Sequence, residues 1–308
     1  MDVINATYLP FTVDQLRAHF APVGGRAADP DRYVKYYLKS VARFDAYTKQ
    51  KPAGKPAEIA RVKRWALQMQ KDERFWIAAA LMKIFHAPER DALLVKLLTR
   101  ALGDVPPFKG CATWAEALGA DLRLYFEVNL PSPPAYKKWL SEHLPQRSLI
   151  PHTLERALAG GITSLEGTTK ADAMLIAPDT GFAVVFEAKV LSDASSHILH
   201  DGTRNQIARN LDVLMDENPQ LLGGLAERDP RRSCFVMVTP ELFREEPESR
   251  LYGWLMNGYR EDTRLLKKHL PHRDIHDLNQ VSRRLGWLTW EDCSRVLPDA
   301  CPWLPRQR

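Results

Sequence analysis

The feature that most constrains the fold of this chain is a β-hairpin predicted between residues 170 and 190. Two apolar runs, 170–177 and 182–190, flank the turn sequence Pro178-Asp-Thr-Gly181, which is a strong hairpin signal. If 178–181 is a four-residue turn, facing residues have numbers that sum to 359, so Asp172 faces Glu187. Facing side chains lie roughly 5 Å apart, and alternation along the strand puts Lys189 on the face of Glu187.

Two carboxylates and an ammonium group are thus predicted side by side in an otherwise apolar sheet. Like charges on facing residues destabilise a sheet unless something compensates them, and a divalent metal is one such compensation. The triplet Glu187-Ala188-Lys189 carries little information by itself, because such spacings arise by chance. Its position at the end of a buried strand, in register with Asp172, makes it a candidate catalytic site. The alternative is a structural ion pair between Lys189 and one of the two carboxylates.

This arrangement resembles the PD-(D/E)xK nuclease superfamily, whose restriction-endonuclease-like core runs helix, three strands, helix, strand. The resemblance covers roughly residues 150–240. It implies an α/β (α+β) fold with a mixed central sheet flanked by helices. Outside the hairpin, the matching segments are a helix at 153–159, a first strand at 162–165, a helix at 204–215 with apolar residues at helical spacing, and a buried strand at 233–239.

The resemblance implies a Mg²⁺ site, in which Mn²⁺ can substitute. Asp172, Glu187 and the backbone carbonyl of Ala188 would hold the ion, which prefers hard oxygen ligands and keeps several waters. Lys189 would orient or help to deprotonate the attacking water and offset charge in the transition state, because a metal or desolvation can lower the pKa of lysine. Glu155 on the first helix is a further candidate ligand. A solvated surface charge is the alternative for Glu155, and Glu166 is a weaker candidate.

The helix after the hairpin supplies further candidates. Gln206 and Arg209 lie on one helix face, and the resemblance implies that such residues contact a substrate phosphate or the carboxylates of the site. Arg204 and Asn205 stand at the start of this helix, where backbone amides favour anions. An ordinary polar helix face is the alternative. The chain departs from the family pattern at Ala171, where the proline of the motif is missing, and at Asn210, where the RecB-like branch has tyrosine.

The charge of the chain is concentrated in its first half. Residues 1–147 contain 23 Lys and Arg against 15 Asp and Glu, whereas the whole chain of 308 residues has a net charge of +5. The segment 32–74 interleaves aromatic and basic residues, which suits binding of a polyanion such as DNA or RNA. The alternative is that the aromatic residues form a helical core and the cations a solvated face.

Helices are expected at 12–20, 31–49, 56–86, 89–102 and 113–127. Prolines at 131, 133, 134, 145 and 151 indicate a boundary. We therefore expect a helical, basic domain at 1–147 for substrate or partner binding, a nuclease-like core at 148–245, and a helical extension packed on it at 246–308.

The remaining composition suits a cytoplasmic protein. The chain is 45% hydrophobic and 26% charged, and it shows neither a membrane-spanning run nor a secretory signal. Its four cysteines are scattered and are expected to be reduced.

These observations predict a Mg²⁺-dependent phosphodiesterase acting on nucleic acid, with DNA favoured, in restriction, phage defence or DNA repair. A homodimer or a larger defence complex is compatible with such a role. The alternatives are a non-catalytic nucleic-acid-binding or assembly protein on the same fold, or a nuclease acting on RNA.

Overall fold

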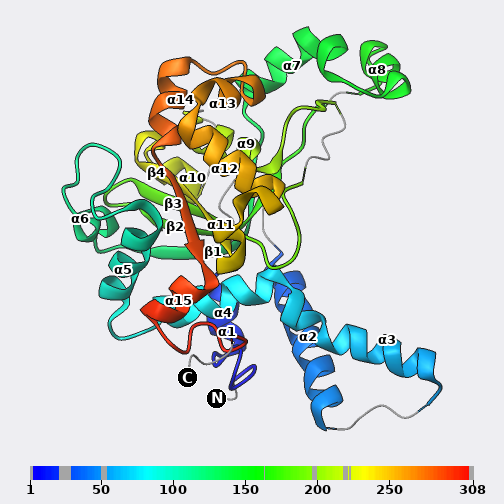
Figure 1. The fold of residues 1–308 in the computed structure, drawn as a ribbon, viewed down its shortest axis with the longest axis vertical. Helices are drawn as coiled ribbons and strands as arrows, with labels where there is room; N and C mark the ends of the chain where they lie inside the picture. The colour runs from blue at the N-terminus through cyan, green and yellow to red at the C-terminus, as the bar shows by residue number, and fades with distance from the viewer. Residues whose placement is uncertain are drawn as a thin grey trace.

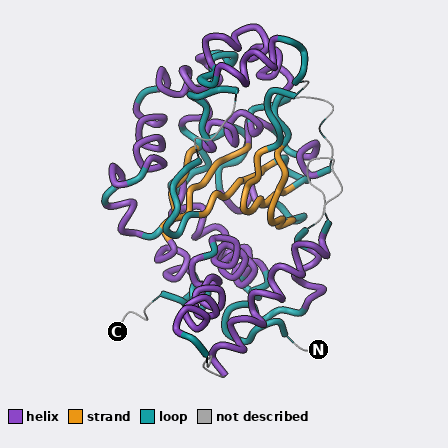
Figure 2. The backbone as a smooth tube through the Cα atoms, turned by 90° about the vertical axis from the view of Figure 1, so that its right-hand side faces the viewer, coloured by secondary structure: helices purple, strands orange, loops and turns teal. Residues whose placement is uncertain are grey.

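A five-stranded mixed sheet forms the centre of the molecule in this computed structural model (Figures 1 and 2). The structure describes residues 3–20, 29–49, 54–162, 164–195, 200–217, 221 and 223–304. The strands follow chain order across the sheet. β1 (Arg123–Leu130), β2 (Thr169–Ala177) and β3 (Phe182–Ala188) are antiparallel neighbours, while β4 (Ser233–Thr239) runs parallel to β3 and β5 (Leu285–Thr289) runs parallel to β4. The predicted mixed sheet flanked by helices is confirmed.

The central strands are apolar because both faces of the sheet are covered. Every residue of β3 and of β4 is buried, as expected for strands between two helical layers. Alternate side chains of β2 enter two different clusters: Leu175 joins the cluster on one face, whereas Met174 joins the cluster on the other. This alternation fixes which side chains of the hairpin share a face.

One face is covered mainly by helices from the first part of the chain. α4 (Glu73–Phe85) crosses β1, β2 and β3, and nine of its residues are buried. Around it pack α1 (Val13–Ala18), α2 (Pro30–Lys49), α5 (Arg90–Leu102) and α15 (Trp290–Val296). The opposite face is covered by α9 (Gln206–Leu214), α12 (Leu251–Glu261), α13 (Thr263–His269) and α14 (Ile275–Ser282).

Shorter elements lie around these two layers. α7 (Pro134–Arg147) and α8 (Pro151–Leu158) meet in a small apolar cluster at one end of the molecule (Figure 1). The other elements are α3 (Pro56–Ala66), η1 (Leu67–Lys71), α6 (Trp114–Leu118), α10 (Gly224–Glu227), η2 (Pro230–Arg232), α11 (Glu241–Glu245) and η3 (Pro247–Ser249). No helix in the described part of the chain has the length and apolar character needed to span a membrane.

The first strand of the sheet differs from the prediction. The helix expected at 113–127 is wrong beyond α6, which stops before Gly119 at a φ of +57°, and β1 follows it. Apolar residues at 124, 126, 128 and 130 alternate with the others, a period of two that indicates a strand. The strand expected at 162–165 is also wrong: 162, 164 and 165 lie outside any strand, and Thr163 is outside the described residues.

Two further predictions need correction. The segment 1–147 is not all helical, because it supplies β1, and the C-terminal segment contributes β5. The long helix expected at 56–86 is broken into α3, η1 and α4, because Asp72 is extended and its side chain accepts a hydrogen bond from the Arg74 N–H at the start of α4. The domain boundaries at 147 and 245 stay predictions, although one sheet draws strands from all three segments.

Candidate functional site

The hairpin keeps the predicted register. β2 and β3 pair from Ala173 with Phe186 to Ala177 with Phe182, and Gly181 closes the turn with a φ of +72°, which glycine adopts readily. The next facing residues in this register are Asp172 and Glu187. The carboxylate of Asp172 reaches across and accepts a hydrogen bond from the N–H of Ala188, at 2.7 Å.

Glu187 is the best-connected carboxylate of the site. It is 2% exposed, and its Oε1 accepts hydrogen bonds from Lys189 Nζ at 2.7 Å and from Gln206 Nε2 at 2.6 Å. Asn210 Nδ2 donates to the other oxygen at 3.2 Å. Three donors therefore hold one buried carboxylate in a single orientation.

The start of α9 brings the two amide donors to this carboxylate. Asn205 caps the helix by accepting a hydrogen bond from the Ala208 N–H, which makes Gln206 the first helical residue. Asn210 follows one turn later on the same face. Asn210 was predicted only as a departure from the family pattern, yet it contacts Glu187 beside Gln206. The four-residue spacing of two amides was the sequence signal for this role.

The charges of the site influence one another. Burial and the charge of Glu187 raise the pKa of Asp172, and burial also raises the pKa of Glu187 despite the neighbouring ammonium group. For Lys189, burial alone would lower the pKa, but the charges of Glu187 and Asp172 outweigh it and raise the pKa. The lowered lysine pKa considered from the sequence is therefore not what this arrangement produces. Lys189 stays a persistent cation between two carboxylates.

A further carboxylate comes from the start of α4. Glu73 Oε1 accepts a hydrogen bond from the Val190 N–H at 3.1 Å and another from the hydroxyl of Ser192. Its charge contributes to the raised pKa values of Glu187 and Lys189. Glu73 was not predicted, because the packing of α4 across β3 is a tertiary contact that the local sequence does not reveal.

Glu127 approaches the site from β1. It is buried, and its φ of +52° is a left-handed conformation that side-chain-bearing residues seldom adopt. The pairing of β1 with β2 skips the position opposite Asp172, so the strand is distorted at this point. Glu127 forms ion pairs with Lys170 at 3.2 Å and with Arg74 at 3.8 Å. Backbone strain of this kind is frequent at functional sites.

Other predicted residues have structural contacts. Arg204 is buried, lies over the ring of Tyr136 at 3.5 Å, and forms ion pairs with Glu166 at 2.8 Å and Asp212 at 2.7 Å. Its guanidinium group has no exposed face for a phosphate. Asn205 is also buried, and besides capping α9 it donates to the Tyr259 hydroxyl at 2.7 Å. Both residues support α9 instead of lining an open surface.

Arg209 and Glu166 form a second pair next to the hairpin. Arg209 Nε lies 3.0 Å from Glu166 Oε1, and its Nη2 donates to the carbonyl groups of Gly167 and Thr168 just before β2. The Arg209 side chain is 20% exposed. It therefore fixes the entry of the chain into β2, while Glu166 is fully engaged by the two arginines.

Glu155 is not brought to the site. It is exposed on α8, which packs against α7 through Leu154 and Ala157 at one end of the molecule (Figure 1). The predicted role of Glu155 as a metal ligand is thereby corrected. Its place on a helix that precedes the hairpin in the sequence was misleading, because the helix that crosses the sheet is α4.

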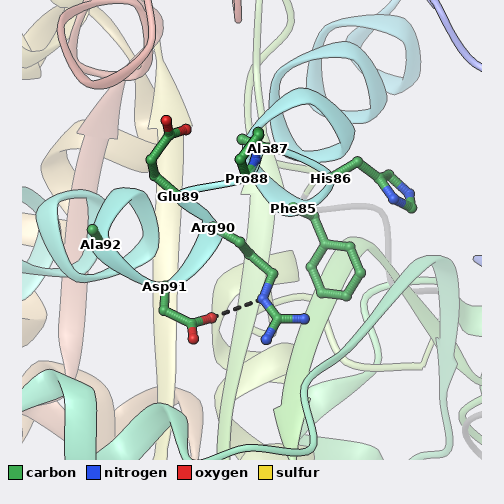
Figure 3. Close-up of a pocket in the computed structure, with 8 residues that line it drawn as sticks. All are labelled: Phe85, His86, Ala87, Pro88, Glu89, Arg90, Asp91 and Ala92. Carbon is green, nitrogen blue, oxygen red and sulfur yellow. Dashed lines mark hydrogen bonds and ion pairs between the residues drawn. The ribbon is translucent and has the colours of Figure 1, made fainter.

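A surface pocket lies elsewhere, at the turn between α4 and α5, where residues 85–92 line it (Figure 3). Arg90 and Asp91 form an ion pair at 2.8 Å on its wall. α4 has 13 residues and is therefore about 20 Å long, with Glu73 at the other end. The pocket and the carboxylate cluster are thus separate features. Among the described residues, no group of three or more His, Cys, Asp or Glu is arranged so that it could hold a metal ion.

Comparisons with known protein families, with curated proteins and with solved structures found no match to this chain.

Proposed function

We propose that this chain is a metal-dependent nuclease that hydrolyses phosphodiester bonds, with DNA as the favoured substrate. The observation that carries the proposal is that Asp172 on β2 and Glu187 on β3 interact through their charges, with Lys189 bonded to Glu187 at 2.7 Å. A buried carboxylate, a half-buried carboxylate and a buried cation that interact at the end of a strand are costly for stability. Such groups with strongly perturbed pKa values concentrate at functional sites.

The order of the elements supports the resemblance to the PD-(D/E)xK superfamily. α4 covers β1, β2 and β3, α9 follows β3 and covers β2 and β4, and β4 runs parallel to β3. If α5 and α6 before β1, α7 and α8 before β2 and α10 before β4 are counted as insertions, this is the order helix, three strands, helix, strand, in which α4 and β1 take the first two places instead of 153–159 and 162–165. The match therefore extends over about residues 73–239 on different elements.

The donor set suits Mg²⁺, for which Mn²⁺ can substitute. The charge of Glu187 raises the pKa of Asp172, so a cation between the two carboxylates relieves a repulsion that the chain alone only partly compensates. Mg²⁺ is usually held by one or two carboxylates together with several waters, so the site needs no third protein carboxylate. Asp172, Glu187 and the Ala188 carbonyl would hold the ion. Bound there, the ion would supply an activated water and polarise the phosphoryl group.

The other side chains have roles that their contacts suggest. The ammonium group of Lys189 offsets negative charge that develops on a phosphate in the transition state, a role for which its raised pKa suits it. Gln206 and Asn210 hold Glu187 through its two oxygens and so keep its carboxylate oriented. Glu73 anchors the segment that follows β3 through Val190 and Ser192.

The test is cleavage of plasmid DNA, single-stranded DNA and RNA with Mg²⁺ and with EDTA. Glu187→Gln and Lys189→Met are compared with the matched controls Glu155→Gln and Lys138→Met, which change exposed residues on α8 and α7. We expect Mg²⁺-dependent cleavage that falls by at least about a hundredfold in the first pair and is unchanged in the second. Activity that survives both site substitutions would refute the site. The substrate panel also separates DNA from RNA as the preferred polymer.

A non-catalytic nucleic-acid-binding protein is the second candidate. It is favoured by the closed contacts of Glu187, whose two oxygens already accept three protein donors. Tight binding of all three polymers without cleavage of any of them by the wild type, in Mg²⁺ or Mn²⁺, would support this reading. Roles in restriction, phage defence or DNA repair, and a homodimeric or larger assembly, remain proposals that depend on the first outcome.

A further inference from the structure

α2 and α3 form a helical hairpin that projects from the body of the molecule (Figure 1). The two helices pack mainly on each other, and α2 reaches the core through its buried residues Val34, Tyr37 and Val41. The outer parts of both helices are therefore surrounded by solvent. We call the described residues of this hairpin, 30–49 and 55–66, the α2–α3 arm.

The arm carries a dense and unpaired positive charge. It contains nine Lys and Arg against three Asp and Glu, and all nine cations are exposed. None of the nine forms an ion pair with a carboxylate among the described residues, in contrast to arginines elsewhere such as Arg123 and Arg295, which pair with carboxylates at 2.7 Å. Its cations are Arg32, Lys35, Lys39, Arg43, Lys49, Lys55, Arg61, Lys63 and Arg64.

An exposed tryptophan joins the two helices of the arm. Trp65 on α3 is 47% exposed, and the guanidinium groups of Arg43 on α2 and Arg61 on α3 lie 5.4 Å and 5.2 Å from its ring centre. The ring thus holds two cations at the surface. A planar aromatic ring beside arginines is a combination that binds nucleic acid, by stacking on bases and by contact with phosphates.

The base of the arm lies beside the candidate site. Lys170, two residues before Asp172 on β2, donates to the Tyr33 hydroxyl of α2 at 3.2 Å and pairs with Glu127 at 3.2 Å. Tyr37 of α2 donates to the Arg74 carbonyl near the start of α4 at 3.1 Å, and the charges of Glu127 and Asp172 help to raise its pKa, which burial raises most. The base of α2 therefore contacts β2 and α4, two of the elements that carry the candidate site.

We propose that the α2–α3 arm binds the sugar-phosphate backbone of nucleic acid that extends beyond the candidate site. The proposal rests on the proposed function for its choice of polyanion, and it names a binding surface distinct from the cleaving residues. With 20 residues, α2 is about 30 Å long, which corresponds to about nine base pairs of duplex. The arm therefore favours substrates longer than those that the site alone can contact.

Binding is measured by fluorescence anisotropy in EDTA, which separates binding from cleavage. The probes are labelled duplexes of about 8 and 30 base pairs and a single strand of about 30 nucleotides. The arm variant Lys39→Ala/Arg43→Ala/Arg61→Ala is compared with Lys138→Ala/Arg156→Ala/Lys268→Ala. The control removes the same number of exposed charges from α7, α8 and α13 at the other end of the molecule. Thermal melts of both variants check that the fold is retained.

The arm variant should bind the long probes about 10- to 100-fold more weakly at ~0.1 M salt. The slope of log K against log[salt] should also become shallower by about two to three, because each phosphate contact on duplex DNA contributes about 0.9 to the slope. The short duplex and the control variant should change by less than about threefold. The comparison of duplex with single strand identifies which form the arm prefers.

Equal losses in the arm and control variants, or none in either, would overturn the proposal. So would arm-dependent binding of phosphatidylserine vesicles with unchanged nucleic-acid affinity. The two proposals fail separately. Arm-dependent binding without any cleavage in Mg²⁺ refutes the nuclease alone, whereas cleavage by a protein whose arm variant keeps full affinity refutes the arm alone.

Discussion

Replacing Asp172 by Asn tests the candidate site without knowledge of its substrate. Asp172 faces Glu187 across the hairpin, and its pKa is raised by burial and by the charge of Glu187. Asn has nearly the same shape and keeps an oxygen that can accept the Ala188 N–H. The substitution therefore removes a charge and leaves the hydrogen bond in place.

The size of the effect follows from the pair of charges. Two carboxylates roughly 5 Å apart repel by about 3 kcal/mol at an effective dielectric constant of about 20. Lys189 attracts both carboxylates and cancels part of this repulsion. We expect Asp172→Asn to raise the free energy of unfolding by about 1–2 kcal/mol, which corresponds to a Tm increase of about 1.5–3 °C for a chain of 308 residues.

Mg²⁺ should stabilise the wild type and leave the stability of Asp172→Asn unchanged. If the wild type binds Mg²⁺ with a Kd of about 1 mM, ~10 mM Mg²⁺ stabilises it by about 1.4 kcal/mol. Asp172→Asn should lose this response, because one of the two charged ligands is gone.

The assay is thermal unfolding in EDTA and in ~10 mM Mg²⁺. Wild type, Asp172→Asn and the control Asp104→Asn are compared, the last being exposed in the loop after α5. A destabilised Asp172→Asn that still responds fully to Mg²⁺ would refute both the repulsion and the proposed metal ligand.

Three other substitutions test further parts of the structure. Arg204→Ala should cost about 1.5–3 kcal/mol in urea unfolding, because buried Glu166 and Asp212 each lose one charged donor and keep another, Arg209 and Arg273 respectively; unchanged stability with weaker DNA binding would restore its predicted role as a substrate contact. Asn210→Ala should lower the cleavage rate about 10- to 100-fold at unchanged DNA affinity, because Glu187 loses one charge-assisted donor; wild-type kinetics would contradict this role. Burial lowers the pKa of His19, so the unfolded chain binds more protons below about pH 6.5 and this group should make stability fall on acidification by up to about 1.4 kcal/mol per pH unit; unfolding of wild type and His19→Gln at pH 7.5 and 5.5 should show a smaller fall in the variant, and equal falls would exclude His19 as a source.

The centre of the site was predictable because its geometry is local. A turn of known length fixes the register of a hairpin, and the register alone places Asp172 opposite Glu187. Gln206 was predicted from the family resemblance, which implies a glutamine on the helix that follows the hairpin. Both predictions use separations along the chain that are short compared with the whole molecule.

The scaffold of the site was less predictable. The sequence contains an apolar helix at 73–85 and an alternating run at 123–130, but nothing local says that these segments pack beside the hairpin. Segments nearer in sequence, at 153–159 and 162–165, offered the same order of elements and were preferred. For this reason Glu73 and Glu127 were not predicted as site residues, whereas Glu155 was.

The buried arginines show a second limit. Arg204 and Arg209 stand near the start of a helix, where the sequence suggests anion binding, and both do bind an anion, namely the carboxylate of Glu166. Sequence alone does not separate a phosphate from a carboxylate of the same chain, since the geometry of recognition is the same.

This ambiguity has a counterpart in the α2–α3 arm. A basic residue that forms an ion pair with a carboxylate of the same chain, as Arg204 does, has its charge neutralised within the fold. The nine cations of the arm have no carboxylate partner among the described residues. The charges that remain unpaired after folding are those available to a partner. On this criterion the arginines predicted for substrate binding hold the site together, and the basic residues of α2 and α3 are the better candidates for contact with a polyanion.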